Sequence, residues 1–157
     1  VEDVAASGGY MIALAGDEII ADQTSIVGSI GVVSGGFGFP ELLKKIGVER
    51  RVYTAGENKV ILDPFKPEKE SDIEYLKTLQ LEIHQVFIDM VVSRRGSVLS
   101  DDPSLFSGLF WTGRRGLELG LVDSLAGEAT GRLCILLARE AERVVRLVAG
   151  IPTVIKE

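Results

Sequence analysis

The sequence predicts a single α/β domain over residues 1–157, and three observations support this class. Of the 157 residues, 46% are hydrophobic, which is enough for one ordinary globular domain with a core. The 18 glycines, together with short runs rich in valine, isoleucine and leucine, are typical of layered α/β proteins with many tight turns. One segment near the middle has the periodicity of a helix long enough to span a domain.

The first third of the chain predicts short strands that alternate with short helices. Short apolar runs predict strands over Val1–Ala6, Glu18–Ala21, Ser25–Val33 and Glu49–Thr54. Helices are expected over Tyr10–Ala15 and Glu41–Ile46, since a glycine follows each and accepts the left-handed conformation that ends a helix. The glycine-rich stretch Ser34–Pro40 is expected to be a loop.

The clearest predicted element is a helix over Glu70–Arg95, which Ser71 or Asp72 is expected to cap. Apolar residues recur in it at three and four positions and predict one buried face: Ile73, Leu76, Leu79, Ile83, Val86, Met90 and Val91. Further helices are expected over Arg114–Leu119 and Thr130–Val148, with a strand or turn at Leu121-Val122 between them.

The composition excludes several classes of function. The net charge of −6 argues against a nucleic-acid binder, because no basic stripe is present to neutralise phosphates. Cys134 is the only cysteine, so neither an intramolecular disulfide nor a cysteine zinc cluster is expected. His84 is the only histidine, and any Ser-His-Asp mechanism would have to use it. No apolar run reaches the roughly 18 residues of a membrane span, so a soluble chain is expected.

Ser7 is the first candidate for a catalytic group. It lies between a predicted strand and a predicted helix, with Ala5-Ala6 before it and Gly8-Gly9 after it. Small neighbours let a substrate carbonyl approach the hydroxyl, and the Gly8 N–H at a helix start is suited to bind the oxyanion of a tetrahedral intermediate. The alternative is a helix N-cap, in which the Ser7 hydroxyl accepts a bond from the same N–H groups. The local pattern alone favours the cap.

A nucleophilic serine needs a base, and two residue types are available. His84 lies inside the long helix without an acidic motif beside it, and an ordinary histidine on the side of a helix is the simpler interpretation. A lysine base must be neutral near pH 7, so its pKa must lie well below the usual value of about 10.4. Lys59 is followed by Val60, Ile61 and Leu62, which are expected to form a dry wall around it. The competing interpretation is a solvated loop lysine.

Four motifs, in order, resemble the signal peptide peptidase A family. The string VAASGGYMIALAGDEIIADQTSIVGSIGVV is similar to that family's nucleophile region, and YTAGENKVILDPF is similar to its Gly-x-x-Lys stretch. The long helix then ends in VSRRG, and FWTGRRGLELGLVDSLAG resembles the family's Thr-Gly-x-x-Ala-x-x-x-Gly-Leu-Val-Asp segment. The resemblance covers residues 1–127. None of the four motifs is specific alone, but their order is.

The resemblance implies a role for each matching residue. Ser7 matches the nucleophile, Lys59 the general base, and Ser29 a serine that orients the lysine amine; the backbone N–H of Gly8 is one oxyanion donor. Asp123, in GLVD, is expected to hold a turn or cap rather than to act in catalysis. The family places a further oxyanion donor on a Gly-Gly turn upstream of the nucleophile strand, and this turn is expected among residues missing before Val1.

The resemblance further implies a ClpP/crotonase-like fold of repeated ββα units with outer helices, here without its N-terminal part. It implies a serine endopeptidase that cuts hydrophobic peptides, such as remnant signal peptides, without a metal or other cofactor. A ring- or dome-shaped homo-oligomer is expected, in a bacterial protein that reaches the membrane only through an anchor preceding Val1. The alternative is a non-catalytic crotonase-like scaffold, or an inactive subunit, that binds hydrophobic segments.

Overall fold

The computed structural model describes residues 1–127, 144–148 and 151–156 and divides the chain into two units. Unit 1 consists of Val1–Gly31 and His84–Glu157, and unit 2 consists of Val32–Ile83. The long helix α3 (Glu70–Arg95) contributes its first part to unit 2 and its last part to unit 1.

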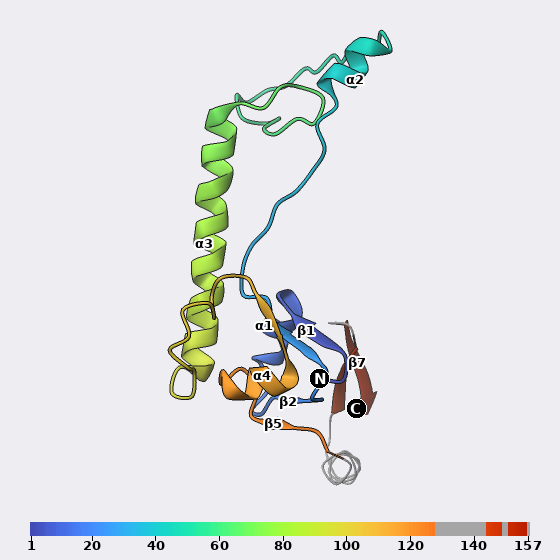
Figure 1. The fold of residues 1–157 in the computed structure, drawn as a ribbon. Helices are drawn as coiled ribbons and strands as arrows, with labels where there is room; N and C mark the ends of the chain where they lie inside the picture. The colour runs from blue at the N-terminus through green and yellow to red at the C-terminus, as the bar shows by residue number, and fades with distance from the viewer. Residues whose placement is uncertain (128–143, 149–150, 157) are drawn as a thin grey trace. The chain divides into compact units, whose positions relative to one another are not determined.

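The described strands of unit 1 form three small sheets (Figure 1). In the first, the strand order is β1 (Val4–Ala6), β3 (Ile26–Gly28) and β4 (Phe110–Thr112). The strand β1 runs parallel to β3, and β4 runs antiparallel to it. The strands β2 (Ile20–Ala21) and β5 (Ser124–Leu125) pair in parallel, while β6 (Val144–Val148) and β7 (Ile151–Lys156) pair antiparallel. The predicted α/β class is confirmed.

The core of unit 1 lies between the first sheet and its helices α1 (Gly8–Ala13), α4 (Gly113–Glu118) and the end of α3. Its largest fully buried apolar side chains come from α1, β3, α3 and the connecting segments: Tyr10, Phe87, Ile30, Leu105, Leu119, Leu121, Val27, Val91 and Val122. Each aliphatic or phenylalanine side chain removed from water in this way contributes about 1.5–3 kcal/mol. Burial therefore fixes the strand ends and α1 against each other.

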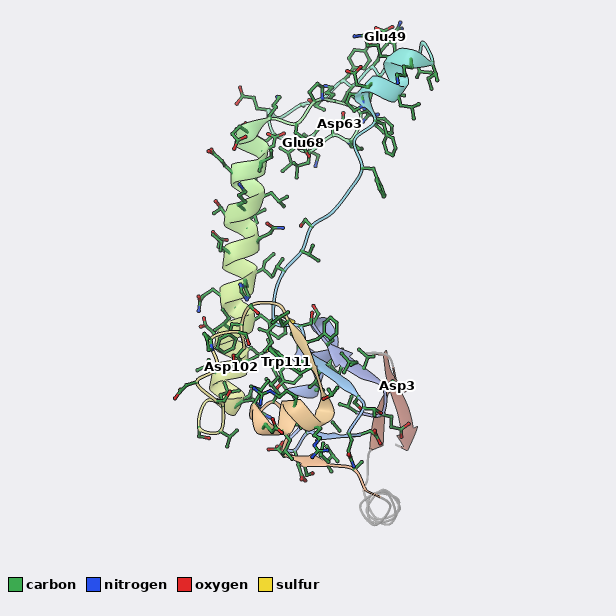
Figure 2. All side chains as sticks on the ribbon, in the orientation of Figure 1. Asp3, Glu49, Asp63, Glu68, Asp102 and Trp111 are labelled. Atoms are coloured by element: carbon green, nitrogen blue, oxygen red, sulfur yellow. The ribbon has the colours of Figure 1, made fainter. Side chains whose placement is uncertain are left out.

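Unit 2 is held together by aromatic and ionic contacts around a short helix, α2 (Pro40–Lys45). Pro40 begins α2 with a favourable φ, and Lys44 and Lys45 lie in its last turn, where cations interact well with the carbonyl groups. The Arg50 guanidinium lies 5.0 Å from the centre of the Phe65 ring, and its Nε donates to the buried Asp63 carboxylate at 2.9 Å. Figure 2 labels Asp63 in this loop.

The predicted strand over Glu49–Thr54 is wrong. These residues have no regular secondary structure, because no described strand lies beside them to complete a ladder. The side chain of Arg50 instead fixes the segment to the loop that carries Asp63.

The long predicted helix is confirmed over Glu70–Arg95, but its predicted buried face is only partly correct. Val91 is buried, together with Phe87 and Arg95, whereas Ile83, Val86 and Met90 are exposed. Asp72 lies inside the first turn rather than at the cap, and its carboxylate accepts the N–H of Leu62. None of the helices that the structure describes is both long and apolar enough to cross a membrane.

The short helices are confirmed to within a few residues by α1, α2 and α4. Most of the helix predicted over Thr130–Val148 lies outside the described residues, and its last five residues form the strand β6 instead. Val144-Val145 and Leu147-Val148 are β-branched or apolar residues that suit an antiparallel pair with β7.

Candidate active site

Ser7 is the single residue that joins β1 to α1. Its N–H donates to the Gly28 carbonyl at 2.8 Å, and its own carbonyl accepts the N–H groups of Tyr10 and Met11 at 2.9 and 3.1 Å. The Ser7 backbone has φ 53° and ψ −122°, the mirror image of the first central residue of a type II turn. This left-handed region costs a residue with a Cβ about 1–3 kcal/mol. The surrounding hydrogen bonds hold Ser7 in that strained conformation.

The Ser7 hydroxyl does not cap α1. Its side chain makes no capping hydrogen bond, and the residue is exposed, so the N-cap interpretation is wrong. Among the described residues the backbone N–H of Gly8 likewise has no acceptor. No atom lies within 4 Å of the position that a Cβ on Gly8 would take, so the space beside the turn is open. An exposed hydroxyl and an unused N–H donor therefore lie next to each other.

Ser29 lies beside this turn, at the end of β3. The parallel register pairs Ala6 with Gly28, so Ser7 and Ser29 each directly follow a paired residue. Ser29 is half-buried with φ 53°, and its N–H donates to the Leu109 carbonyl at 2.8 Å. The structure thus brings Ser7, Gly8 and Ser29 to the carboxyl ends of two parallel strands, an edge where α/β proteins commonly place their sites.

Gly28 explains why this edge is shaped as it is. It has φ +92°, and a Cβ on it would lie 2.7 Å from Cε3 of Trp111. Only glycine combines this backbone with the close approach of the indole ring. Trp111, labelled in Figure 2, therefore packs over the residue whose carbonyl holds the Ser7 N–H.

Lys59 belongs to unit 2 and lies in a turn in which its N–H donates to the Gly56 carbonyl at 3.3 Å. The lysine is exposed, and Val60 beside it is 37% exposed, so the predicted dry wall of apolar neighbours is wrong. Leu62 has φ 53°, and its N–H donates to the Asp72 carboxylate at 3.2 Å. The pairing of Lys59 with Ser7 stays a prediction.

His84 has a structural contact. Its Nε2 lies 3.1 Å from the carbonyl oxygen of Ile30, in the chain that follows β3. A carbonyl oxygen only accepts, so Nε2 is the donor in this contact, which leaves Nδ1 as the ring nitrogen with a free lone pair. The contact ties α3 to the end of β3 and supports the simpler interpretation of this histidine.

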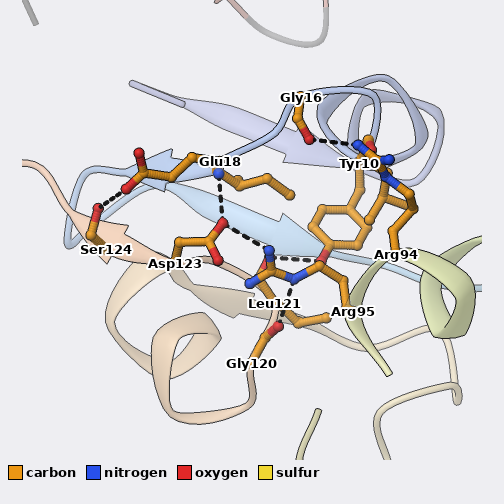
Figure 3. A network of polar contacts seen from close by, with 11 residues as sticks. Tyr10, Gly16, Glu18, Arg94, Arg95, Gly120, Leu121, Asp123 and Ser124 are labelled. Carbon is orange, nitrogen blue, oxygen red and sulfur yellow. Dashed lines mark hydrogen bonds and ion pairs between the residues drawn. The ribbon is translucent and has the colours of Figure 1, made fainter. Parts of the chain in front are cut away.

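A polar network lies under α1, and it contains residues that the sequence did not single out (Figure 3). The Tyr10 hydroxyl donates to the Leu121 carbonyl at 2.7 Å, and Arg95 donates to the Gly120 carbonyl at 2.9 Å. Arg95 also binds the Asp123 carboxylate at 2.7 Å, and the same carboxylate accepts the N–H of Ile19. Asp123 therefore joins distant segments, rather than holding the local turn or cap expected of it.

The ionisation of two of these groups is shifted by the network. The hydrogen bond from Arg95 holds the pKa of Asp123 below its ordinary value, with help from the Ile19 N–H and against the effect of partial burial. Burial raises the pKa of the Tyr10 phenol well above its ordinary value near 10, an effect that Arg95 opposes and Asp123 adds to. Tyr10 thus remains a hydrogen-bond donor over the whole physiological range of pH.

Comparison with known proteins now adds to this geometry. The sequence profile of Peptidase family S49 matches residues 1–133. The chain belongs to peptidase family S49. The resemblance of its motifs to the signal peptide peptidase A family is thereby confirmed, and the match includes both the Ser7 turn and the Lys59 segment.

Individual S49 relatives carry protease names. The chain is 39% identical over 126 residues to "Probable protease SohB" of Buchnera aphidicola subsp. Schlechtendalia chinensis. This match covers 80% of this chain and 40% of that protein. It is 34% identical over 131 residues to "Serine protease SPPA, chloroplastic" of Arabidopsis thaliana, which covers 81% of this chain and 19% of that protein. The chain thus spans less than half the length of these relatives.

A third relative has a different name. The chain is 78% identical over 125 residues to a protein of Brucella abortus (strain 2308) named "Na(+)/H(+) antiporter NhaA". The match covers 80% of this chain but 17% of the Brucella protein, so the name describes a chain of which the matched segment is a small part. The S49 profile, which covers residues 1–133 of this chain, is the more direct guide to the segment itself.

Proposed function

We propose that this chain carries the nucleophile and the general base of a serine endopeptidase that uses a Ser7–Lys59 dyad. The single observation that carries the proposal is the Ser7 turn, with its strained backbone and its exposed hydroxyl that caps no helix. Strained residues of this kind cluster at active sites. Membership of a peptidase family supports the same reaction class. A ClpP/crotonase-like fold of the whole enzyme is part of the proposal.

In the proposed acylation step, the Ser7 oxygen attacks the carbonyl carbon of the scissile peptide bond while its proton passes to the neutral amine of Lys59. The negative charge that develops on the carbonyl oxygen is stabilised by the N–H of Gly8 and by a second hydrogen-bond donor. The Lys59 ammonium then donates its proton to the leaving amine, and an acyl-Ser7 ester remains. In deacylation, Lys59 takes a proton from water as the water oxygen attacks the ester carbon. The bond between that carbon and the Ser7 oxygen then breaks, the acid product leaves, and Lys59 returns the proton to Ser7.

The exposure of Lys59 adds a condition to this mechanism. A lysine acts as a base when it loses contact with water, because desolvation disfavours the ammonium form. Lys59 must therefore become covered when the working site forms, either by substrate or by a neighbouring subunit. We propose a homo-oligomer in which Lys59 serves a Ser7 of its own or an adjoining chain, and Ser29 orients the amine.

Apolar residues near the turn support hydrophobic peptides as the substrate class. Leu109 and Phe110 are 54% and 63% exposed, and both adjoin the end of β3 through the Ser29–Leu109 hydrogen bond and the Gly28–Phe110 pairing. An exposed apolar surface of this kind favours binding of apolar side chains. We propose membrane-derived segments such as remnant signal peptides, reached by an enzyme whose membrane anchor lies in other residues.

The dyad is tested by labelling the purified protein with a fluorophosphonate probe and by hydrolysis of casein and of a signal peptide. The wild-type protein is expected to be labelled at Ser7 and to cut both substrates, whereas Ser7→Ala should do neither while keeping its fold. Lys59→Arg should also be inactive, because arginine does not deprotonate in this range of pH.

Matched controls make the result specific. Ser93→Ala and Lys77→Arg change the same residue types at exposed positions of α3 and should retain full activity. Full hydrolysis by Ser7→Ala or Lys59→Arg would exclude the dyad. A folded wild-type protein that is never labelled would favour the non-catalytic scaffold that binds hydrophobic segments.

A further inference from the structure

The helix α1, which begins directly after Ser7, is held near both ends by hydrogen bonds to distant parts of the chain. Near its start, the Tyr10 hydroxyl donates to the Leu121 carbonyl, 111 residues away, at 2.7 Å. At its end, Arg94 on α3 donates from Nε to the Leu14 carbonyl at 2.8 Å and from an amino group to the Gly16 carbonyl at 2.9 Å. A cation at this end also matches the direction of the helix dipole.

The groups that accept hydrogen bonds from Tyr10 and Arg95 all lie in one short segment, Gly120–Asp123 (Figure 3). The Gly120 carbonyl accepts from Arg95, the Leu121 carbonyl from Tyr10, and the Asp123 carboxylate from Arg95 and the Ile19 N–H. Arg95 is 7% exposed and Leu121 is fully buried, so the bonds to the Gly120 and Leu121 carbonyls are buried, whereas the Asp123 carboxylate is partly exposed. Buried, fully paired networks of this kind are rigid and define a single arrangement.

Tyr10 connects this rigid network directly to the nucleophile. Its backbone N–H donates to the carbonyl of Ser7 at 2.9 Å, while its hydroxyl is fixed to Leu121. The Tyr10 side chain is fully buried, so the ring has no freedom to turn away. One residue thus joins the strained peptide of Ser7 to a segment more than 100 residues further along the chain.

We infer that Tyr10 is a positioning residue for the nucleophile: its hydroxyl, supported by the Arg94 and Arg95 contacts, holds the Ser7 turn in the geometry that attack on a peptide carbonyl requires. The inference rests on the proposed function, because it assigns Tyr10 a part in the reactivity of Ser7. Tyr10 does not touch the substrate. Its contribution acts on the rate of acylation rather than on substrate binding.

The test is Tyr10→Phe, which removes one oxygen atom and keeps the ring in the core. The second-order rate of fluorophosphonate labelling is measured well below the melting temperature, together with kcat and KM for a signal peptide. Because small misplacements of reacting groups are costly, labelling and kcat should fall roughly 10- to 100-fold while KM stays unchanged. A residue that only stabilised the fold would lower the melting temperature and leave the labelling rate of the folded protein unchanged.

Three further variants complete the experiment. Tyr75→Phe makes the same chemical change at an exposed position of α3 and should have no effect. Leu105→Ala removes a buried core side chain outside the network, so it should lower the melting temperature without slowing the labelling of the folded protein. Arg94→Lys, at an exposed position, is expected to fold normally but to slow labelling, since a single amine does not reproduce the two fixed donors.

The outcomes separate the two proposals. Slow labelling of Tyr10→Phe and Arg94→Lys, with Leu105→Ala labelled at the wild-type rate, would support the positioning role. A labelled wild-type protein whose Tyr10→Phe and Arg94→Lys variants react equally fast would overturn this inference alone. A folded wild-type protein that is not labelled at Ser7 would overturn both this inference and the proposed function.

Discussion

Replacing Ser7 by glycine is expected to make the protein more stable while it abolishes reaction with a fluorophosphonate. The backbone of Ser7 has φ 53° and ψ −122°, a region that glycine occupies without steric cost and that any residue with a Cβ occupies with strain. Ser7→Gly therefore removes the strain together with the hydroxyl. Ser7→Ala removes the hydroxyl alone, because alanine keeps the Cβ.

The magnitude follows from two opposing effects. Relief of the strained backbone should stabilise Ser7→Gly by about 1–3 kcal/mol. The greater freedom of glycine in the unfolded chain should cost it about 0.5–1 kcal/mol. Ser7→Gly should therefore be more stable than Ser7→Ala by about 1 kcal/mol, which for a chain of this length corresponds to a rise in melting temperature of roughly 2–4 °C.

The assay is thermal unfolding of the wild-type protein, Ser7→Ala and Ser7→Gly under identical conditions, with probe labelling as the functional readout. Wild type and Ser7→Ala should melt at similar temperatures, since the exposed hydroxyl makes no hydrogen bond that caps α1. A Ser7→Gly protein that melts below Ser7→Ala would refute the reasoning. In that case the positive φ would not be a source of strain.

Two further predictions concern the surroundings of the turn. Gly28→Ala should destabilise the protein by about 1–3 kcal/mol more than Gly108→Ala does, measured by urea unfolding. Both glycines have positive φ, but a Cβ at Gly28 meets the Trp111 ring at 2.7 Å, whereas at Gly108 the nearest atom is 3.9 Å away; equal losses would contradict the clash. The Asp123–Arg95 pair should contribute stability above the unfolded pKa of an aspartate, about 3.9, that is lost as the pH falls through the lower folded pKa. Asp123→Asn should therefore lose less stability than the wild type between neutral pH and pH 3, and parallel curves would argue against this linkage.

Much of the fold could be predicted from local patterns, because local patterns determine the regular elements. The helix Glu70–Arg95 was predicted to the residue. The helix α2 was predicted one residue late from the glycine that follows it, since Pro40, which begins it, was assigned to the preceding loop. The strand expected over Glu49–Thr54 failed because a strand needs a partner, and the segment is fixed by Arg50 instead. The buried face of α3 was predicted only in part, because the spacing of its apolar residues does not show which of them face the core.

In the candidate site, too, features that depend on local sequence could be predicted, whereas contacts between distant segments could not. The position of Ser7 between a strand and a helix was predicted from the sequence. The resemblance assigned Ser29 to the same site, but the parallel pairing that brings both serines to one edge comes from the structure alone. The network of Tyr10, Arg94 and Arg95 was not predicted, because its partners lie 25 to 111 residues away in sequence. The environment of Lys59 was predicted wrongly, since three apolar neighbours in sequence do not have to surround a side chain in space.

The backbone of Ser7 excludes the capping interpretation and is compatible with the proposed nucleophile. A capping serine has an extended backbone and directs its hydroxyl to the N–H groups of the first turn. Ser7 has a positive φ, leaves its hydroxyl exposed, and leaves the Gly8 N–H without an acceptor among the described residues. For stability alone, glycine would be the better residue at this φ. A serine with capping geometry would be the better arrangement at this helix start. Ser7 meets neither of these conditions. The proposed action of its hydroxyl and of the neighbouring N–H on a substrate would explain why a serine lies at this position.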